Sequence, residues 1–165
     1  MIDKKNFYIN GKWVKPAKAN DYNVVNPSNE EVFAVISLGS KDDTDSAVKS
    51  AKRAFDQWKE TLVDERINFL EKLLKVYKKR FNEIAEAMSM EMGSPIDYAT
   101  MVHAASGQAH LEDFILRLKN FKFGEDFNSK SNNYIAREPI GVCGLITPWN
   151  WPINQIALKV IPALA

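Results

Sequence analysis

The single cysteine of this sequence, Cys143, is the first candidate for a catalytic nucleophile. A thiol attacks substrates as the thiolate, which needs a cationic or acid–base neighbour. Cys143 lies between Val142 and Gly144 in an apolar run, with no such partner nearby in the sequence. We therefore expect a buried structural thiol. One cysteine cannot form an internal disulfide, which is typical of a protein from a reducing cytoplasm.

Two histidines are the other candidates for metal or acid–base chemistry. His103 and His110 are seven residues apart and would share one face of a helix. Two histidines could begin a metal site, but the sequence shows no third ligand close to them. We expect packing or surface roles for both, and no metal site.

The composition and charge of the chain argue against some classes of binding partner. The 165 residues are 45% hydrophobic and 26% charged, as in an ordinary globular chain of about one domain. Lys and Arg total 22 against 21 Asp and Glu, so nothing favours nucleic acid or an anionic membrane surface as a partner. We see no signal peptide and no apolar run long enough to span a membrane. The expected setting is the cytoplasm.

The first forty residues predict short strands joined by turns. Asn10-Gly11 favours a type I′ hairpin turn, because both central residues of that turn need a positive φ. Period and turn signals place strands at residues 7–9, 13–14, 22–25 and 32–36.

Helices are expected in the middle of the chain. Ser40 and Asp43 form a capping-box pattern that predicts a helix start. From Asp64 to Gly93, apolar residues recur in steps of three and four, which predicts one long helix. About three heptads is marginal for a coiled coil, so a helix packed on a sheet fits this repeat better. A further helix is expected from Pro95 to about residue 120, weakened in its middle by a glycine.

The last part of the chain changes character again. Residues 121–127 and 132–137 predict a polar ribbon around a turn at 128–131. Residues 140–146 predict a central strand buried on both faces, followed by a break and a helix from 153 with Pro152 near its start. Such a strand–turn–helix unit is half of a βαβ crossover, and the partner strand would have to come later in a longer chain.

Two segments carry a family resemblance. Arg137-Glu138-Pro139-Ile140-Gly141-Val142, followed by Pro148-Trp149-Asn150-Trp151-Pro152, resembles the aldehyde dehydrogenase superfamily, whose members carry R-E-P-x-G-V leading into P-W-N-[FYW]-P. Further similar segments occur in the family's order, namely residues 9–13, 26–27, 51–58 and 91–95. The resemblance covers all 165 residues, and these correspond to the N-terminal portion of a longer family chain.

The resemblance implies an α/β fold, namely the N-terminal part of a doubly wound, Rossmann-like cofactor domain with a β-ribbon oligomerisation arm. Residues 1–120 would be the first part of the cofactor domain, and residues 121–139 the arm. Residues 140–165 would be the start of a truncated core strand–turn–helix. The full-length chain is expected to form a homo-oligomer, a dimer or a tetramer.

The resemblance also implies an activity. Family members oxidise an aldehyde to a carboxylic acid with NAD or NADP, through a cysteine thiohemiacetal. Their nucleophilic cysteine and general-base glutamate belong to later motifs that this chain does not contain. We therefore expect the 165-residue chain to be inactive alone.

By resemblance, the Asn150 side-chain amide is half of the oxyanion hole. A fixed neutral donor at that place stabilises the charge that develops on the former carbonyl oxygen. The alternative role for Asn150 is an N-cap of the helix that begins near Pro152. Lys159 matches a lysine that takes part in a proton relay in several relatives, and its alternative is an exposed lysine on an amphipathic helix.

The same resemblance indicates which residues would form one wall of a cofactor site. No G-x-G-x-x-G fingerprint occurs, so the residue pattern alone does not predict a dinucleotide site. Core packing is the alternative for Trp149 and Trp151, and it is favoured for Trp151. The residues that would line the nicotinamide and ribose are Ile146, Thr147, Pro148, Trp149 and Asn150.

Other interpretations remain open at this point. Many relatives have an acidic residue near the position of His103 that helps to hold a monovalent cation, so the histidine argues against that site here. The chain could be a non-catalytic truncated subunit that docks onto full-length partners through the ribbon. It could also be a helical interaction module that uses residues 67–88 as its working surface.

Overall fold

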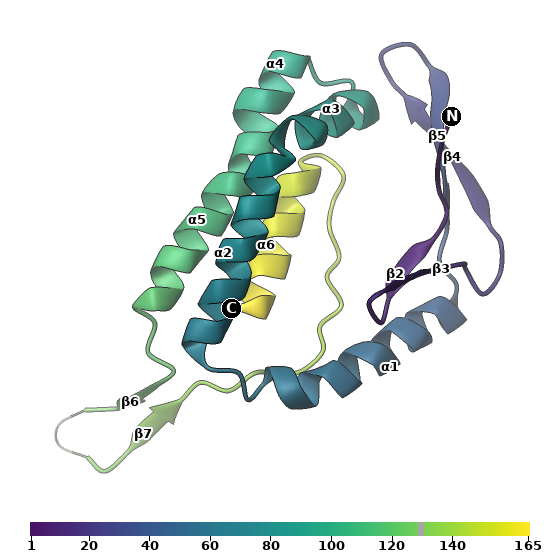
Figure 1. Cartoon of the computed structure of the whole chain (residues 1–165). Helices are drawn as coiled ribbons and strands as arrows, with labels where there is room; N and C mark the ends of the chain where they lie inside the picture. The colour runs from purple at the N-terminus through teal and green to yellow at the C-terminus, as the bar shows by residue number, and fades with distance from the viewer. Residues whose placement is uncertain (129–130) are drawn as a thin grey trace.

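Small sheets and a bundle of helices make up the fold (Figure 1). The computed structural model describes residues 1–128 and 131–165. In these residues the strands form three separate sheets, of which one has three strands and two have two strands. The expected turn at 128–131 includes residues 129 and 130, which lie outside the described part of the chain.

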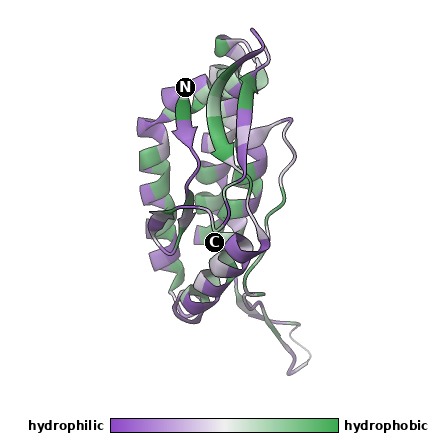
Figure 2. Cartoon of the chain, turned by 90° about the vertical axis from the view of Figure 1, so that its right-hand side faces the viewer, coloured by the Kyte–Doolittle hydropathy of each residue, from purple (hydrophilic) through white to green (hydrophobic). Residues whose placement is uncertain are grey.

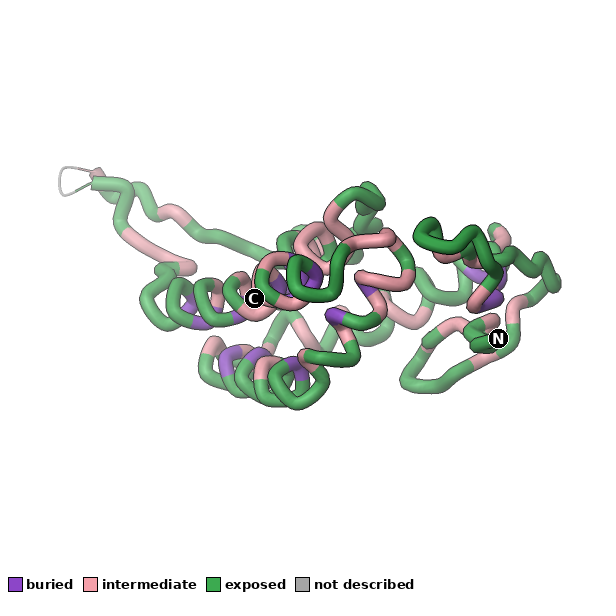
Figure 3. Tube along the Cα trace, turned by 90° about the horizontal axis from the view of Figure 1, so that it is seen from above, coloured by how far each residue is buried: buried purple, intermediate pink, exposed green. Residues whose placement is uncertain are grey.

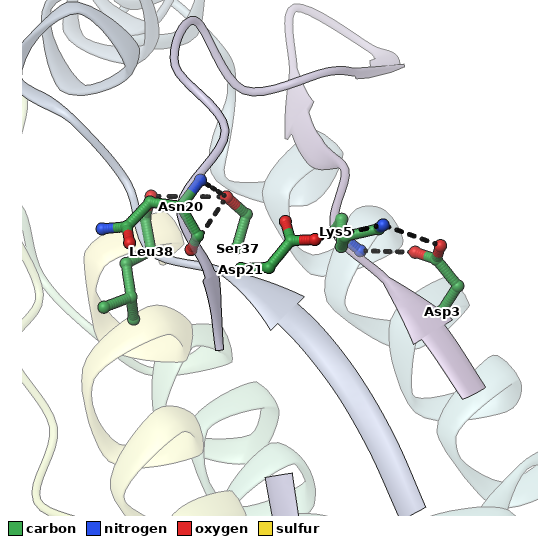
Figure 4. A network of polar contacts seen from close by, with 6 residues as sticks. All are labelled: Asp3, Lys5, Asn20, Asp21, Ser37 and Leu38. Atoms are coloured by element: carbon green, nitrogen blue, oxygen red, sulfur yellow. Dashed lines mark hydrogen bonds and ion pairs between the residues drawn. The ribbon is translucent and has the colours of Figure 1, made fainter. Parts of the chain in front are cut away.

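The three-stranded sheet has β5 (Glu31–Ser37) at its centre. It pairs with β4 (Asp21–Asn26) in antiparallel fashion and with β1 (Ile2–Lys4) in parallel. The strands at 22–25 and 32–36 are therefore confirmed, whereas the sequence pattern missed β1. Polar contacts close the end of this sheet: the Lys5 ammonium lies 3.3 Å from an Asp21 carboxylate oxygen, and the Asn20 amide donates to the Ser37 hydroxyl at 3.3 Å (Figure 4).

The expected hairpin is present. β2 (Phe7–Ile9) pairs antiparallel with β3 (Lys12–Val14). Asn10 has φ 55° and Gly11 has φ 73°, the two positive values that a type I′ turn requires.

Helix α1 (Lys41–Trp58) begins at the predicted capping box. The Asp43 amide bonds to the Ser40 hydroxyl, and the Asp43 carboxylate accepts the Ser40 amide at 2.8 Å. The other Asp43 oxygen accepts the Ala17 amide at 2.8 Å, which ties the helix start to the chain after β3.

The prediction of one long helix from Asp64 to Gly93 is wrong in one respect. The chain forms α2 (Val63–Lys79) and α3 (Phe81–Met92), separated by Arg80 at φ −104° and ψ 15°. The Arg80 amide is shared between the carbonyls of Val76 and Tyr77 at 3.0 Å each, as in a tightened last turn. Periodicity could not show this break, because the apolar repeat continues through it.

The next helical stretch contains an unexpected π-helical turn. It consists of α4 (Ile96–Tyr98), the π turn η1 (Ala99–Ala104) and α5 (Ala105–Lys119), so the expected helix end near residue 120 is confirmed. Gly93 ends α3 in the left-handed conformation with φ 70°, as a C-terminal glycine does.

The main core lies between α2, α5 and α6 (Pro152–Leu164). Viewed from above, buried positions occur along the helices, and a few more lie in the sheet near the N-terminus (Figure 3). Figure 2 shows the alternation of hydrophobic and hydrophilic residues along the helices and strands. The buried residues of this core are Ile67, Leu70, Tyr77, Leu111, Ile115, Leu118, Ala157 and Ile161.

The expected ribbon is also present. β6 (Gly124–Asp126) pairs antiparallel with β7 (Tyr134–Ala136), and the ribbon projects from the rest of the chain (Figure 1). The Arg137 guanidinium bonds to the Glu125 carboxylate across it at 2.7 Å.

The predicted strand at residues 140–146 is wrong for this chain. The segment from the ribbon to α6 has no regular secondary structure, and Ile140 and Ile146 are 93% and 88% exposed. A strand of a parallel sheet receives its hydrogen bonds from neighbouring strands, and no described strand lies beside this segment. For the same reason Cys143 is exposed, which corrects the expectation of a buried thiol.

Within the described residues, every helix is too short or too polar to cross a membrane.

Candidate functional site

The candidate site residues Ile146 to Asn150 form one continuous stretch that leads into α6. In Figure 1 this stretch is the last part of the long irregular segment, before the chain turns into the helix. All five side chains are exposed, and Trp149 is 85% exposed. Core packing, the alternative considered for Trp149, is therefore wrong in this structure.

Asn150 is not the N-cap of α6. The helix begins at Pro152, and the N-cap position is taken by Trp151, whose side chain makes no capping hydrogen bond. Among the described residues, no hydrogen bond involves the Asn150 side chain. Its amide is therefore available to a group that comes from outside these residues, such as a ligand oxygen.

Trp151 packs against a buried histidine of the π turn. The rings of Trp151 and His103 are 4.9 Å apart with an interplanar angle of 66°. His103 is 3% exposed and also contacts the Tyr98 ring at 5.2 Å. The expectation that Trp151 packs is confirmed. No local pattern indicates its partner, because the two residues lie far apart in the chain.

Lys159 lies two helical turns into α6, roughly 10 Å along the axis from Pro152 at 1.5 Å per residue. Its ammonium donates to the Gln155 side-chain oxygen at 3.1 Å, and the residue is half-buried. On the same helix, the Asn154 side-chain oxygen lies 2.7 Å from His110 Nε2, a contact that joins α6 to α5. The structure thus brings Lys159 onto the helix that follows Asn150, without a described contact between the two.

The remaining chemical side chains stay apart from this stretch. The Cys143 thiol contacts only the Gly141 carbonyl, at 3.6 Å, among its described hydrogen-bond partners. In the described residues, no group of three or more His, Cys, Asp or Glu side chains could hold a metal ion. His103 and His110 have separate partners and do not face a common ligand position.

Two hollows lie elsewhere on the molecule. One of about 300 Å³ lies along α2 and α3, and its lining includes the apolar Leu73 and Met88 as well as the charged Arg80 and Glu83. The other, of about 430 Å³, lies between the hairpin and α1, with Lys12 and Arg53 in its lining. Neither includes residues of the 146–150 stretch, all five of which are exposed.

The mixed α/β fold and the motifs at the entry to α6 agree with the family resemblance of the sequence. The sequence model of the aldehyde dehydrogenase family matches residues 13–165, and the chain belongs to this family. A curated relative, the 3-succinoylsemialdehyde-pyridine dehydrogenase of a Pseudomonas species, is 44% identical over 166 residues. That match covers 100% of this chain and 34% of the relative.

Solved structures show the same likeness. An aldehyde dehydrogenase of Bartonella henselae has a TM-score of 0.97 at 49% identity, covering 99% of this chain and 35% of its own. Aldehyde dehydrogenase C of Pseudomonas syringae, in complex with NAD+ and octanal, has a TM-score of 0.92 at 38% identity, covering 97% of this chain and 32% of its own. A Mycobacterium tuberculosis aldehyde dehydrogenase complexed with NAD+ has a TM-score of 0.91 at 26% identity, covering 99% of this chain and 34% of its own.

These comparisons confirm the expected fold, the N-terminal portion of the aldehyde dehydrogenase α/β fold. The chain spans about a third of the length of the relatives it matches. Because the Bartonella likeness covers 99% of the chain, it extends through nearly all of the irregular segment before α6.

Proposed function

We propose that the protein containing this chain is an NAD-dependent aldehyde dehydrogenase that oxidises an aldehyde to a carboxylic acid. Membership of the family and the NAD+ bound in similar structures support this proposal. The octanal in the Pseudomonas syringae complex supports a small aldehyde as the substrate class. The structural observation that carries the proposal is the exposed Asn150 amide at the entry to α6, which is not used as a helix cap.

Asn150 would stabilise the transition state. When a nucleophile adds to the aldehyde carbon, negative charge develops on the former carbonyl oxygen. An amide N–H aimed at that oxygen stabilises the charge and, being neutral, does not lose its proton to it. The cysteine that attacks and the glutamate that activates water would come from beyond the motifs of this chain.

The stretch before Asn150 fits one wall of a nicotinamide site. The exposed Ile146 and Trp149 offer apolar surface for a flat ring, and Thr147 offers a hydroxyl for a polar group. Pro148 fixes one backbone φ angle between them. NAD, when bound, supplies the hydride acceptor, and Ile146, Thr147, Pro148, Trp149 and Asn150 are the residues of this chain that would hold it.

Lys159 would take part in moving a proton. Its ammonium already bonds to the Gln155 side chain, and its half-buried position reduces exchange with bulk solvent. A lysine in such a position can hold a proton near a site without being freely solvated. We propose that it serves the active site in this way.

The projecting ribbon of β6 and β7 suggests how the protein assembles. A projecting two-stranded ribbon buries little of its own surface, and isolated hairpins are marginally stable. We propose that residues 121–139 form an arm that pairs with another subunit of a homo-oligomer in the cytoplasm. Residues 1–120 and 140–165 then belong to the cofactor domain.

The test is an assay of the native polypeptide that carries this sequence. It is purified and mixed with a panel of aldehydes and with NAD or NADP, and the absorbance of the reduced cofactor is followed. We expect turnover with NAD and a carboxylate product, and no turnover by the 165-residue chain alone. Absence of turnover with every aldehyde would contradict the proposal, and an inactive chain that co-purifies with a longer subunit would favour the docking alternative.

A further inference from the structure

His103 stands in an unusual backbone setting. The π turn η1 (Ala99–Ala104) interrupts the long helix, and π turns are rare and are found frequently at functional sites. The turn is fixed to α2, because the Tyr77 hydroxyl donates to the Ala104 carbonyl at 2.7 Å. The neighbouring residues His103 and Ala104 are both buried, at 3% and 0% exposure. The backbone that carries His103 is therefore tied to α2 by this hydrogen bond.

The contacts of the His103 ring are aromatic ones. Its ring meets Tyr98 at 5.2 Å and 79°, and Trp151 at 4.9 Å and 66°, both in edge-to-face geometry. Its Nδ1 is buried and has no hydrogen-bond partner among the described residues. A buried nitrogen without a partner is unfavourable, and the favourable side-chain contacts described for His103 are those with the two aromatic rings.

The contact with Trp151 acts where the chain enters α6. Trp151 has φ −145° and ψ 67°, outside helical geometry, and no side-chain cap holds the helix start. The four residues before Asn150 are exposed and make no strand. The packing of the Trp151 ring on His103 is thus a side-chain contact that restrains the residue next to Asn150.

We propose that His103 is a positioning residue for Asn150. Its ring holds the Trp151 indole, and the indole fixes the direction in which the adjoining Asn150 amide points. This inference rests on the proposed role of Asn150 at the oxyanion. It assigns His103 no contact with substrate or cofactor.

Three variants of the native polypeptide test this role. His103→Ala removes the ring, His103→Asn keeps a polar group without the ring, and His103→Phe keeps a ring without nitrogens. Ala and Asn should lower kcat on the order of tenfold, with the KM for aldehyde nearly unchanged, because an existing donor is misdirected. Phe should restore kcat. His110→Ala is the matched control, since it breaks the Asn154 contact on the same helices and should leave kcat as it is.

A spectroscopic readout follows the indole itself. The protein is labelled with fluorotryptophan, and the Trp151 resonance is assigned from its loss in Trp151→Phe. Ala and Asn at position 103 should shift this resonance strongly, and Phe should leave it closer to its native position. In the Asn150→Ala background, His103→Ala should lower kcat no further, because the two changes act through one group.

Several results would overturn the inference. One is a normal kcat in His103→Asn together with a low kcat in His103→Phe. That pair of results would show that hydrogen bonding by His103, and not its ring, supports turnover. Another is an unshifted Trp151 resonance in His103→Ala. If His103→Ala does not fold, the Asn and Phe variants decide. If Asn150→Ala itself leaves kcat unchanged, the proposed function fails, and the resonance still reports whether His103 holds Trp151.

Discussion

Gly107 on α5 faces Tyr77 on α2 at such close range that no side chain fits between them. A Cβ built on Gly107 would lie 2.4 Å from the Tyr77 hydroxyl oxygen and 3.0 Å from a side-chain carbon of Ile153 on α6. The glycine therefore lets three helices approach one another at the centre of the bundle. In the sequence, this glycine indicates only a weak point of its helix.

Gly107→Ala should destabilise the protein although alanine is the better helix former. In an open helix the change would stabilise by about 1 kcal/mol. Here the added methyl group must push Tyr77 away, and overpacking of a core costs about 1–3 kcal/mol. Thermal or urea unfolding of the purified protein measures the sign. A variant at least as stable as the native protein would show that the helices are not packed this closely.

Tyr77→Phe should destabilise the protein and change its response to alkali. The variant removes the hydrogen bond from the hydroxyl to the Ala104 carbonyl, and a typical hydrogen bond contributes about 0.5–1.5 kcal/mol. Burial raises the pKa of Tyr77 to about 12, from an ordinary 10.0. The unfolded chain therefore loses this proton first, and the folded state loses stability as the pH rises from 10 to 12.

The difference in stability between the native protein and Tyr77→Phe should therefore shrink over that alkaline range. Unfolding midpoints measured in denaturant at several pH values test this. A difference that stays constant across the range would mean that Tyr77 is solvated in the folded state.

Asp43→Asn should remove a stabilisation that depends on pH. The Asp43 pKa is lowered from 3.8, first by the Ser40 hydroxyl and then by the amides of Ala17 and Ser40. A lowered pKa means that the stabilisation is present above the ordinary value and is lost as the pH falls through the folded value. The variant should thus melt earlier than the native protein at neutral pH and approach it in acid.

The exposed neighbour Asp42 supplies the control for this prediction. It precedes Asp43 in the first turn of α1 and makes no described hydrogen bond. Asp42→Asn should therefore melt close to the native protein at neutral pH. An equal loss in both variants would point to the general charge of the helix start and away from the specific contacts of Asp43.

Local signals in the sequence were sufficient for much of the fold. The Asn10-Gly11 turn and the Ser40–Asp43 box depend on residues within a few positions of one another, so they can be recognised without the tertiary structure. The parallel pairing of β1 with β5 joins distant segments, and a three-residue strand carries little pattern of its own. The break at Arg80 lies inside an uninterrupted apolar repeat and left no trace in the periodicity.

The motif predicts the position of the candidate site, whereas its packing is visible only in the structure. The motif located Asn150 at the start of a helix, but the choice between a cap and a free amide needed the geometry of Trp151. The apolar run before it predicted a buried strand, because hydropathy reports what a segment prefers and not which partners are present. The His103–Trp151 contact joins two distant segments, and no local pattern announces it.

The kcat of Asn150→Ala in the native polypeptide, at saturating NAD and aldehyde, tests the central claim most directly. Loss of one oxyanion donor lowers kcat by about 100- to 1,000-fold in enzymes that use such a site. We predict a loss of that order in Asn150→Ala, and a kcat close to native in Asn154→Ala, an asparagine in the first turn of α6. A native kcat in Asn150→Ala would contradict the role assigned to this amide.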